Sequence, residues 1–126
     1  MKDDQILLIH IQHEMVFLQR ISRDRTLDDL IHDEYYAHAV KSAIEVIGEA
    51  AKMISPAIKE QYPAIEWRRM AQMRDRIIHR YFDINWKLVW DVIKIEIPTL
   101  EPKIVAIIHQ LDTKPRGKIS NNRPGS

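Results

Sequence analysis

The fold is decided by residues 37–53, AHAVKSAIEVIGEAAKM, in which apolar residues recur three and four positions apart. This segment holds Gly48, one of only three glycines in the chain, and the other two, Gly117 and Gly125, lie near the C-terminus. A chain body with almost no turn-forming glycine and with long apolar stretches at this spacing is typical of helices. We therefore predict an all-α protein in which residues 37–53 lie deep in the core, as the second half of a helix that ends near Ile54.

One further helix is predicted before the helix that contains this segment. This first helix runs from about Asp4 to Ile21. Thr26, followed three residues later by Asp29, resembles a capping box and begins the long helix that continues to Ile54. The apolar face of the first helix is expected to consist of Ile6, Ile9, His10, His13, Phe17 and Leu18.

Prolines and polar residues divide the rest of the chain. Pro56 and Pro63 leave room for at most a short helix between them, and a third long helix is predicted from about 64 to 83. Asn85 can cap the next helix.

That last helix is interrupted by prolines in our prediction. Pro98 and Pro102 break it, and residues 100–111 complete it. Because short connections make consecutive helices antiparallel neighbours, we predict a four- to five-helix antiparallel bundle, one domain covering residues 1–111. Residues 112–126 carry four basic residues against one acidic residue and are rich in proline, glycine, serine and asparagine. They are predicted to form a disordered basic tail, with contact to nucleic acid as the alternative.

Composition narrows the class of protein. The chain is 45% hydrophobic and 29% charged, which is typical of a soluble globular domain. No apolar run approaches the roughly 18 residues of a membrane span, and the N-terminus is polar and acidic, so we expect a cytoplasmic protein that does not bind membranes. With no cysteine, disulfides and thiolate metal sites are excluded. His10 and His13 are three residues apart but lack a third ligand nearby, so we expect two partly buried histidines and no metal.

Residues 74–81, RDRIIHRY, hold the candidate chemistry. On a helix, Arg74 falls within the apolar stripe, where a guanidinium is rare unless it is paired or functional. It either forms an ion pair with Glu45 or Glu49, or lines a cleft and binds phosphate with its planar fork. Asp75 and His79 are four residues apart, which suits either a carboxylate that raises the imidazole pKa for acid–base work or a plain surface pair.

The spacing of Arg74 and His79 raises a geometric question. Five positions place them about 140° apart on a regular helix. Either the helix distorts near its end, or both side chains face a cleft shared by two chains, which predicts a two-fold homodimer. Arg69, Arg76 and Arg80 form a basic stripe with Met73 that either guides an RNA backbone or is simply solvated.

In these residues the chain resembles the HepT group of HEPN proteins. Arg74, His79 and Tyr81 match that group's R-x4-H-x-Y motif. The similarity covers about residues 4–111. It is supported by the segments Ile47-Gly48-Glu49-Ala50-Ala51-Lys52, Trp67, Ile77-Ile78-His79, Tyr81-Phe82-Asp83-Ile84, Val89-Trp90 and Ile97-Pro98-x-Leu100.

The resemblance implies a metal-independent endoribonuclease without a cofactor that works as a homodimer on RNA, possible targets being tRNA or mRNA. Arg74 would stabilise charge on the scissile phosphate, His79 would act as general acid or base, and Asp75 would orient the pair. Two departures stand out: Asp75 replaces the usual asparagine, and Arg80 replaces the usual glycine.

The resemblance also implies a partner. HepT toxins are paired with an MntA-type nucleotidyltransferase antitoxin in type VII-like toxin–antitoxin systems. The antitoxin transfers AMP to the motif tyrosine, here Tyr81, which adds bulk and negative charge beside the cleft. The alternatives are a non-catalytic HEPN subunit that binds a nucleotidyltransferase or a nucleotide, and a structural helical dimerisation module.

Overall fold

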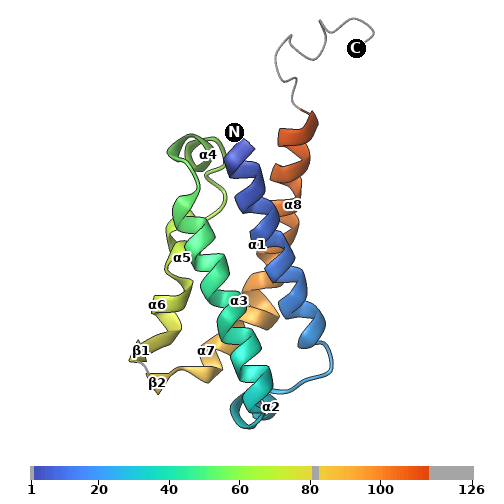
Figure 1. The fold of residues 1–126 in the computed structure, drawn as a ribbon, viewed down its shortest axis with the longest axis vertical. Helices are drawn as coiled ribbons and strands as arrows, with labels where there is room; N and C mark the ends of the chain where they lie inside the picture. The colour runs from blue at the N-terminus through green and yellow to red at the C-terminus, as the bar shows by residue number, and fades with distance from the viewer. Residues whose placement is uncertain (1, 81–82, 114–126) are drawn as a thin grey trace, which may run out of the picture.

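The structure, a computed structural model, describes residues 2–80 and 83–113 and is a helical bundle (Figure 1). The predicted all-α bundle is confirmed, with one addition, a short pair of strands that the sequence did not indicate. The elements in chain order are α1 (Lys2–Ile21), α2 (Leu27–His32), α3 (Glu34–Met53), α4 (Pro56–Gln61), α5 (Trp67–Ala71), α6 (Met73–Ile77), β1 (Ile78–Arg80), β2 (Asp83–Ile84), α7 (Trp86–Asp91), the π-helical turn η1 (Val92–Glu96) and α8 (Ile97–Thr113). All but the first two residues of the predicted tail lie outside the described residues.

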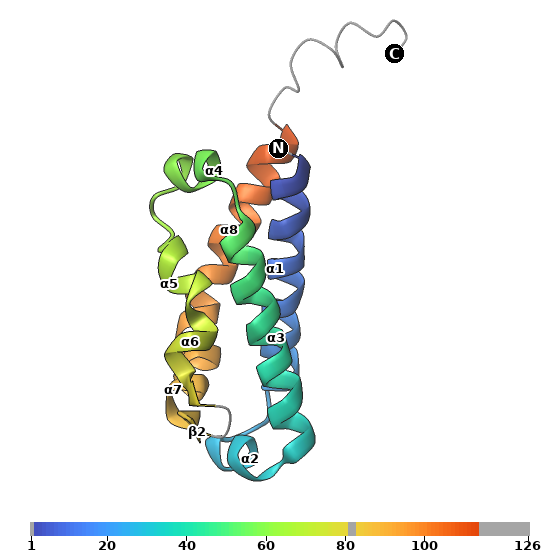
Figure 2. The same ribbon diagram turned by 60° about the vertical axis from the view of Figure 1, so that its left-hand side comes forward.

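Three long helices form the frame of the bundle. α1 packs against both α3 and α8, and α5 and α6 lie along α3 on its other side (Figures 1 and 2). The β1–β2 pair, α2 and α7 gather at one end of the bundle, and α4 lies at the other end with the start of α1 (Figure 2). The core runs along the whole axis between these layers.

The buried face of α1 differs from the predicted one. Of the six residues predicted for it, only Leu18 is fully buried, while His10 and His13 are exposed. Two apolar stripes run along this helix, and the buried one has the more regular heptad-like spacing. Its members are Leu8, Ile11, Met15 and Leu18.

A buried carboxylate fixes the start of α1. Asp4 is only 4% exposed. It accepts hydrogen bonds from the backbone N–H of Ser55 at 2.9 Å and from the Ser55 hydroxyl at 2.7 Å. Ser55 in turn caps α4, so Asp4 ties α1 to the junction between α3 and α4.

The long helix predicted from Thr26 to Ile54 is broken once. The capping box is confirmed, since Thr26 and Asp29 exchange hydrogen bonds at 3.1 and 2.9 Å. The break falls at Asp33, whose backbone is extended and whose carboxylate accepts from the N–H of Tyr36 at 3.1 Å. A side chain that caps a helix here stabilises a new start in place of a continuous helix.

The prediction of a third long helix, from about 64 to 83, was wrong. Only α5 and α6 are helical, and they are separated at Gln72. From Ile78 the chain is extended, and β1 pairs antiparallel with β2. The backbone N–H of Asn85 donates to the carbonyl of Ile77 at 2.8 Å, and two successive β-branched residues, Ile77 and Ile78, favour an extended chain at this point. The predicted cap by Asn85 is confirmed, since it accepts from the N–H of Leu88 at 3.0 Å.

The two prolines do not interrupt the last helix, contrary to our prediction. The chain passes from α7 through η1 into α8, which contains both Pro98 and Pro102. The wider turn of η1 bonds the N–H of Ile97 to the carbonyl of Val92, five residues back, just before the position where Pro98 lacks a donor. The Thr99 hydroxyl donates to the carbonyl of Ile95 at 3.1 Å. These adjustments let the helix continue through the prolines.

Gly48 sets how closely α5 and α6 approach α3. A Cβ atom at this position would lie 3.3 Å from the carbonyl oxygen of Ala71 and 4.0 Å from the backbone nitrogen of Arg74. The atoms that it would meet belong to backbone, which cannot rotate away as a side chain can. The absence of a side chain at residue 48 therefore brings the segment that carries Arg74 directly onto α3.

We expect Gly48→Val to lower the free energy of unfolding by roughly 1–3 kcal/mol, because the added methyl groups overpack this contact. Urea denaturation measures the change. Ser42→Val, at an exposed position of the same helix, is the matched control for the β-branched side chain. Equal stability of the two variants would show that a side chain at residue 48 does not hinder the packing of α5 and α6 against α3.

Candidate active site

The helix ends between the two predicted catalytic residues. Arg74 and Asp75 lie in α6, whereas the backbone of His79 lies in β1. The alternative in which the helix distorts near its end is thus confirmed. The prediction that Asp75 and His79 share one helical face was wrong, because the backbone is extended over Ile78–Arg80. Tyr81 and the side chains of His79 and Arg80 lie outside the described part of the chain.

Arg74 lies at the surface beside α3, not within an apolar stripe. Its neighbours Met73 and Ile77 are fully buried, but the Arg74 side chain itself is 47% exposed. Its Nε lies 3.1 Å from Oε2 of Glu45, and its Nη1 lies 3.5 Å from Oδ1 of Asp75. The predicted alternative of an ion pair with α3 is therefore confirmed for Glu45.

This ion pair positions Arg74 without burying it. Glu45 is 46% exposed, and pairs this exposed contribute little to stability. Nη2 has no carboxylate partner among the described residues. Nε of the guanidinium is thus held against α3, while the side chain as a whole remains 47% exposed, so its planar fork is accessible to a phosphate.

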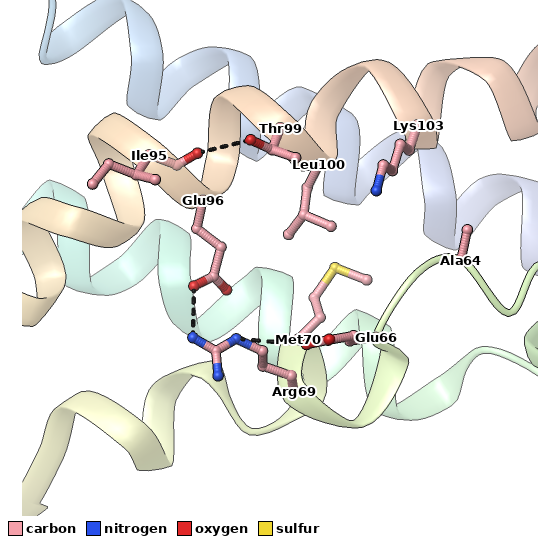
Figure 3. Close-up of a pocket in the computed structure, with 9 residues that line it drawn as sticks. All are labelled: Ala64, Glu66, Arg69, Met70, Ile95, Glu96, Thr99, Leu100 and Lys103. Carbon is pink, nitrogen blue, oxygen red and sulfur yellow. Dashed lines mark hydrogen bonds and ion pairs between the residues drawn. The ribbon is translucent and has the colours of Figure 1, made fainter.

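A second ion-pair network joins α6 to η1. Arg76 and Glu96 form a bidentate pair at 2.9 and 3.0 Å, with side chains that are 17% and 19% exposed. Arg69 reaches the same carboxylate at 3.4 Å and Glu66 at 3.8 Å, as the dashed lines in Figure 3 show for Arg69. Burial by itself raises the pKa of the Glu96 carboxyl, but the hydrogen bonds and positive charges of Arg76 and Arg69 outweigh this and hold the pKa below its ordinary value.

The arginines of the predicted RNA-binding stripe thus differ in their surroundings. Arg76 is mostly buried and engaged with Glu96, whereas Arg69 remains 52% exposed. Met73, predicted on the same outer stripe, is buried in the core. A contact of Arg69, Arg76 or Arg80 with RNA stays a prediction.

The pocket next to this network lies between α5 and α8 (Figure 3). It has a volume of about 320 Å³, and Met70 and Leu100 form an apolar part of its lining. Its charged lining residues are the two cations Arg69 and Lys103 and the two carboxylates Glu66 and Glu96, so their charges cancel. It lies across α5 from Gly48 and offers an RNA strand no net attraction.

Glu96 is a structural residue that the sequence did not reveal. It lies in the apolar run Val92-Ile93-Lys94-Ile95-Glu96-Ile97, and a carboxylate in such a run was the available signal. The close approach at Gly48 was not predicted either, although a glycine inside a helical pattern indicates a packing or functional reason.

Neither a metal site nor a membrane span is found among the described residues. They contain no group of three or more side chains of metal-ligating type that could hold an ion. Within the same residues, every helix is too short or too polar to cross a lipid bilayer.

Comparison with known proteins identifies the family. The model of the HepT-like ribonuclease family matches residues 11–107, and the chain belongs to this family.

Three curated relatives support the assignment. A protein of Caldanaerobacter subterraneus named "Putative RNase" is 33% identical over 110 residues, which cover 87% of this chain and 98% of the relative. A "Probable ribonuclease HepT" of Thermococcus cleftensis is 37% identical over 93 residues, 74% of this chain and 84% of the relative. A "Gamma-glutamylcyclotransferase and putative RNase" of Methanocaldococcus jannaschii is 36% identical over 117 residues. That match covers 93% of this chain but only 53% of the relative, so the chain spans about half of that protein's length. No solved structure matches the chain.

We expect the stability contributed by Glu96 to depend on pH with a definite sign. A carboxyl whose pKa is lower in the folded state stabilises the fold above its unfolded pKa, near 4.5, and loses this contribution as the pH falls through the lower folded value. At pH 7, Glu96→Gln should therefore unfold more easily than wild type by roughly 1–3 kcal/mol. The difference should shrink as the pH falls below 4.5.

Urea denaturation of both proteins between pH 7 and pH 3 measures this difference. Glu60→Gln, at an exposed position of α4, serves as the control for loss of one carboxylate. A difference between wild type and Glu96→Gln that stays constant over the whole range would contradict a lowered pKa at Glu96.

Proposed function

We propose that this protein is a metal-independent RNA endonuclease that acts as a homodimer. The observation that carries the proposal is the state of Arg74: it stands half exposed beside the bundle, held by Glu45 at one edge, in a chain of the HepT-like ribonuclease family. An arginine needed only for stability is expected to be bonded as Arg76 is, in a bidentate and mostly buried ion pair.

The proposed reaction uses the 2′-hydroxyl of RNA as nucleophile. A His79 imidazole removes its proton, the 2′-oxygen bonds to phosphorus, and the bond to the 5′-oxygen breaks. A protonated His79 imidazole, most simply from the second chain of the dimer, returns a proton to that oxygen. The products are a 2′,3′-cyclic phosphate and a 5′-hydroxyl, and Arg74 stabilises the negative charge that develops on the phosphate oxygens.

Asp75 has a supporting role in this proposal. Its carboxylate lies 3.5 Å from Nη1 of Arg74, whereas Glu45 holds Nε, so the two carboxylates together orient the guanidinium. The same carboxylate repels phosphate, and a phosphate that binds Arg74 must compete with it. Arg69, Arg76 and Arg80 remain proposed contacts to the RNA backbone.

We expect total RNA to be cleaved by the wild type in the presence of EDTA, and Arg74→Ala and His79→Ala each to lose at least about 100-fold of the rate. Arg23→Ala, which removes an exposed arginine near the end of α1, should cleave as the wild type does. Gel analysis of cleaved tRNA and mRNA measures the rate. Circular dichroism and sedimentation check that every variant is folded and dimeric.

The outcome separates the proposal from its alternatives. If wild type whose mass equals that of the unmodified chain cuts no RNA, the protein is a non-catalytic HEPN subunit. If the variants fail to fold, the motif serves as a structural ion-pair network. The two carboxylates that flank Arg74 are the observation that favours the non-catalytic alternative, since both disfavour phosphate.

We further propose that the ribonuclease is the toxin of a type VII-like pair and that an MntA-type nucleotidyltransferase silences it. The phenolic oxygen of Tyr81 would attack the α-phosphorus of ATP, pyrophosphate would leave, and the phenolic proton would pass to a base. The AMP group would then occupy the site that binds the RNA phosphate, and its negative charge would repel RNA.

We expect the wild type to gain the mass of one AMP when it is incubated with such an enzyme, Mg²⁺ and ATP, and to lose its ribonuclease activity. Tyr81→Phe should gain nothing and stay active. Tyr35→Phe, which alters a tyrosine that is 88% exposed, should be modified like the wild type. Intact-protein mass spectrometry reads the result, and modification of Tyr81→Phe to the same extent would refute the assignment of the residue.

A further inference from the structure

A groove on the Arg74 side of α5 carries an uncompensated positive charge. It lies between the end of α3, α4 and α5, and has a volume of about 630 Å³. Three cations from three different elements line it, Lys52, Lys59 and Arg68, and the one carboxylate in its lining is Glu66. These residues sum to +2, whereas the charges that line the pocket across α5 cancel.

The nearby carboxylates do not remove this charge. Glu66 also approaches Arg69, at 3.8 Å, on the other side of α5. Glu49 lies 3.3 Å from Lys52, but these side chains are 68% and 50% exposed, and such a pair competes weakly with a phosphate.

The floor of the groove suits a ligand recognised by charge and not by base identity. Ile65 and Trp67 are 4% and 6% exposed, so neither presents a face for stacking. The indole N–H of Trp67 donates to the carbonyl of Tyr62 at 2.9 Å and is therefore occupied. Among the described residues, the polar lining consists of the charged side chains and the amide of Gln72.

The groove and Arg74 belong to one continuous seam. Ala71 and Gln72 line the groove, and the backbone of Ala71 and Arg74 meets α3 at Gly48. On α3, Glu45 and Lys52 are seven residues apart, or about 10 Å along the helix axis. Figures 1 and 2 show α5 and α6 following α3 over this length, from the end near α4 toward β1.

We propose that Lys52, Lys59 and Arg68 form a phosphate-binding subsite that holds the backbone of single-stranded RNA beside the reacting bond at Arg74. This assignment rests on the proposed ribonuclease function and names the path of its substrate. The strand runs along the α3 seam, and the groove binds nucleotides that flank the cleavage position.

The test measures binding of a 2′-O-methylated 20-nucleotide RNA, which cannot be cleaved by 2′-hydroxyl attack. The groove variant Lys52→Gln/Lys59→Gln/Arg68→Gln is compared with Arg20→Gln/Arg23→Gln/Lys103→Gln, which loses the same charge away from the seam. Each contact to a single strand contributes about 0.7 to the slope of log K against log salt. The groove variant should therefore lose about 2 from this slope and bind about 100-fold more weakly at 0.1 M salt, while the control keeps the wild-type slope.

RNA cleavage assays distinguish the role of this subsite from that of the catalytic residues. The groove variant should cut a dinucleotide as fast as the wild type and lose about 100-fold in kcat/KM on the 20-nucleotide RNA without methylation, in line with its weaker binding. Equal binding by the two triple variants, or no binding by the wild type, would overturn the proposal that the groove binds RNA. Groove-dependent binding without cleavage by any form overturns the ribonuclease function and leaves the groove in place.

Discussion

The backbone of residues 71–74 can lie directly against α3 because residue 48 has no side chain, and the rest of this face depends on that contact. A Cβ at Gly48 would stand 3.3 Å from the Ala71 carbonyl oxygen. The close approach lets short helices such as α5 and α6, which could not persist alone, bury Trp67, Met70, Met73 and Ile77 against the frame. It also sets Arg74 within reach of Glu45, one turn away on α3.

The α5–α6 segment is bounded by two seams of opposite character. On the η1 side, Arg76 and Arg69 share the mostly buried Glu96, Arg69 also approaches Glu66, and the two positive and two negative charges balance. On the α3 side, Arg74 is paired only with the exposed carboxylates of Glu45 and Asp75, and three further cations line the adjoining groove. The first arrangement holds the segment to the bundle. The second leaves positive charge available to a polyanion, which is why the proposed chemistry belongs there.

The sequence predicted the helical bundle, the caps at Thr26 and Asn85 and the residues of the motif, because these follow from local patterns. It failed where tertiary contacts decide the local structure. The chain leaves the helix at Ile78, where the backbone N–H of Asn85, the residue after β2, donates a competing hydrogen bond to the carbonyl of Ile77. The choice between two apolar stripes on α1 depended on packing partners that the pattern does not contain. Arg74 and Arg76 look alike in sequence. Only the position of Glu96, in η1, distinguishes the mostly buried Arg76 from the exposed Arg74.

The π-helical turn η1 has a consequence for the register of the last third of the chain. A five-residue hydrogen-bonded loop holds one residue more than a regular turn, which advances everything after it by about 100° around the axis. Val89 before the turn and Ile97, Ile104 and Ile107 after it are all buried, so the two parts face the same core in different helical phases. Deleting a single residue within the turn would restore regular hydrogen bonding. It would also rotate the apolar stripe of α8 relative to that of α7, so that the two would no longer face the same core. In this stretch of the chain, an insertion or deletion of one residue is therefore a larger perturbation than most substitutions.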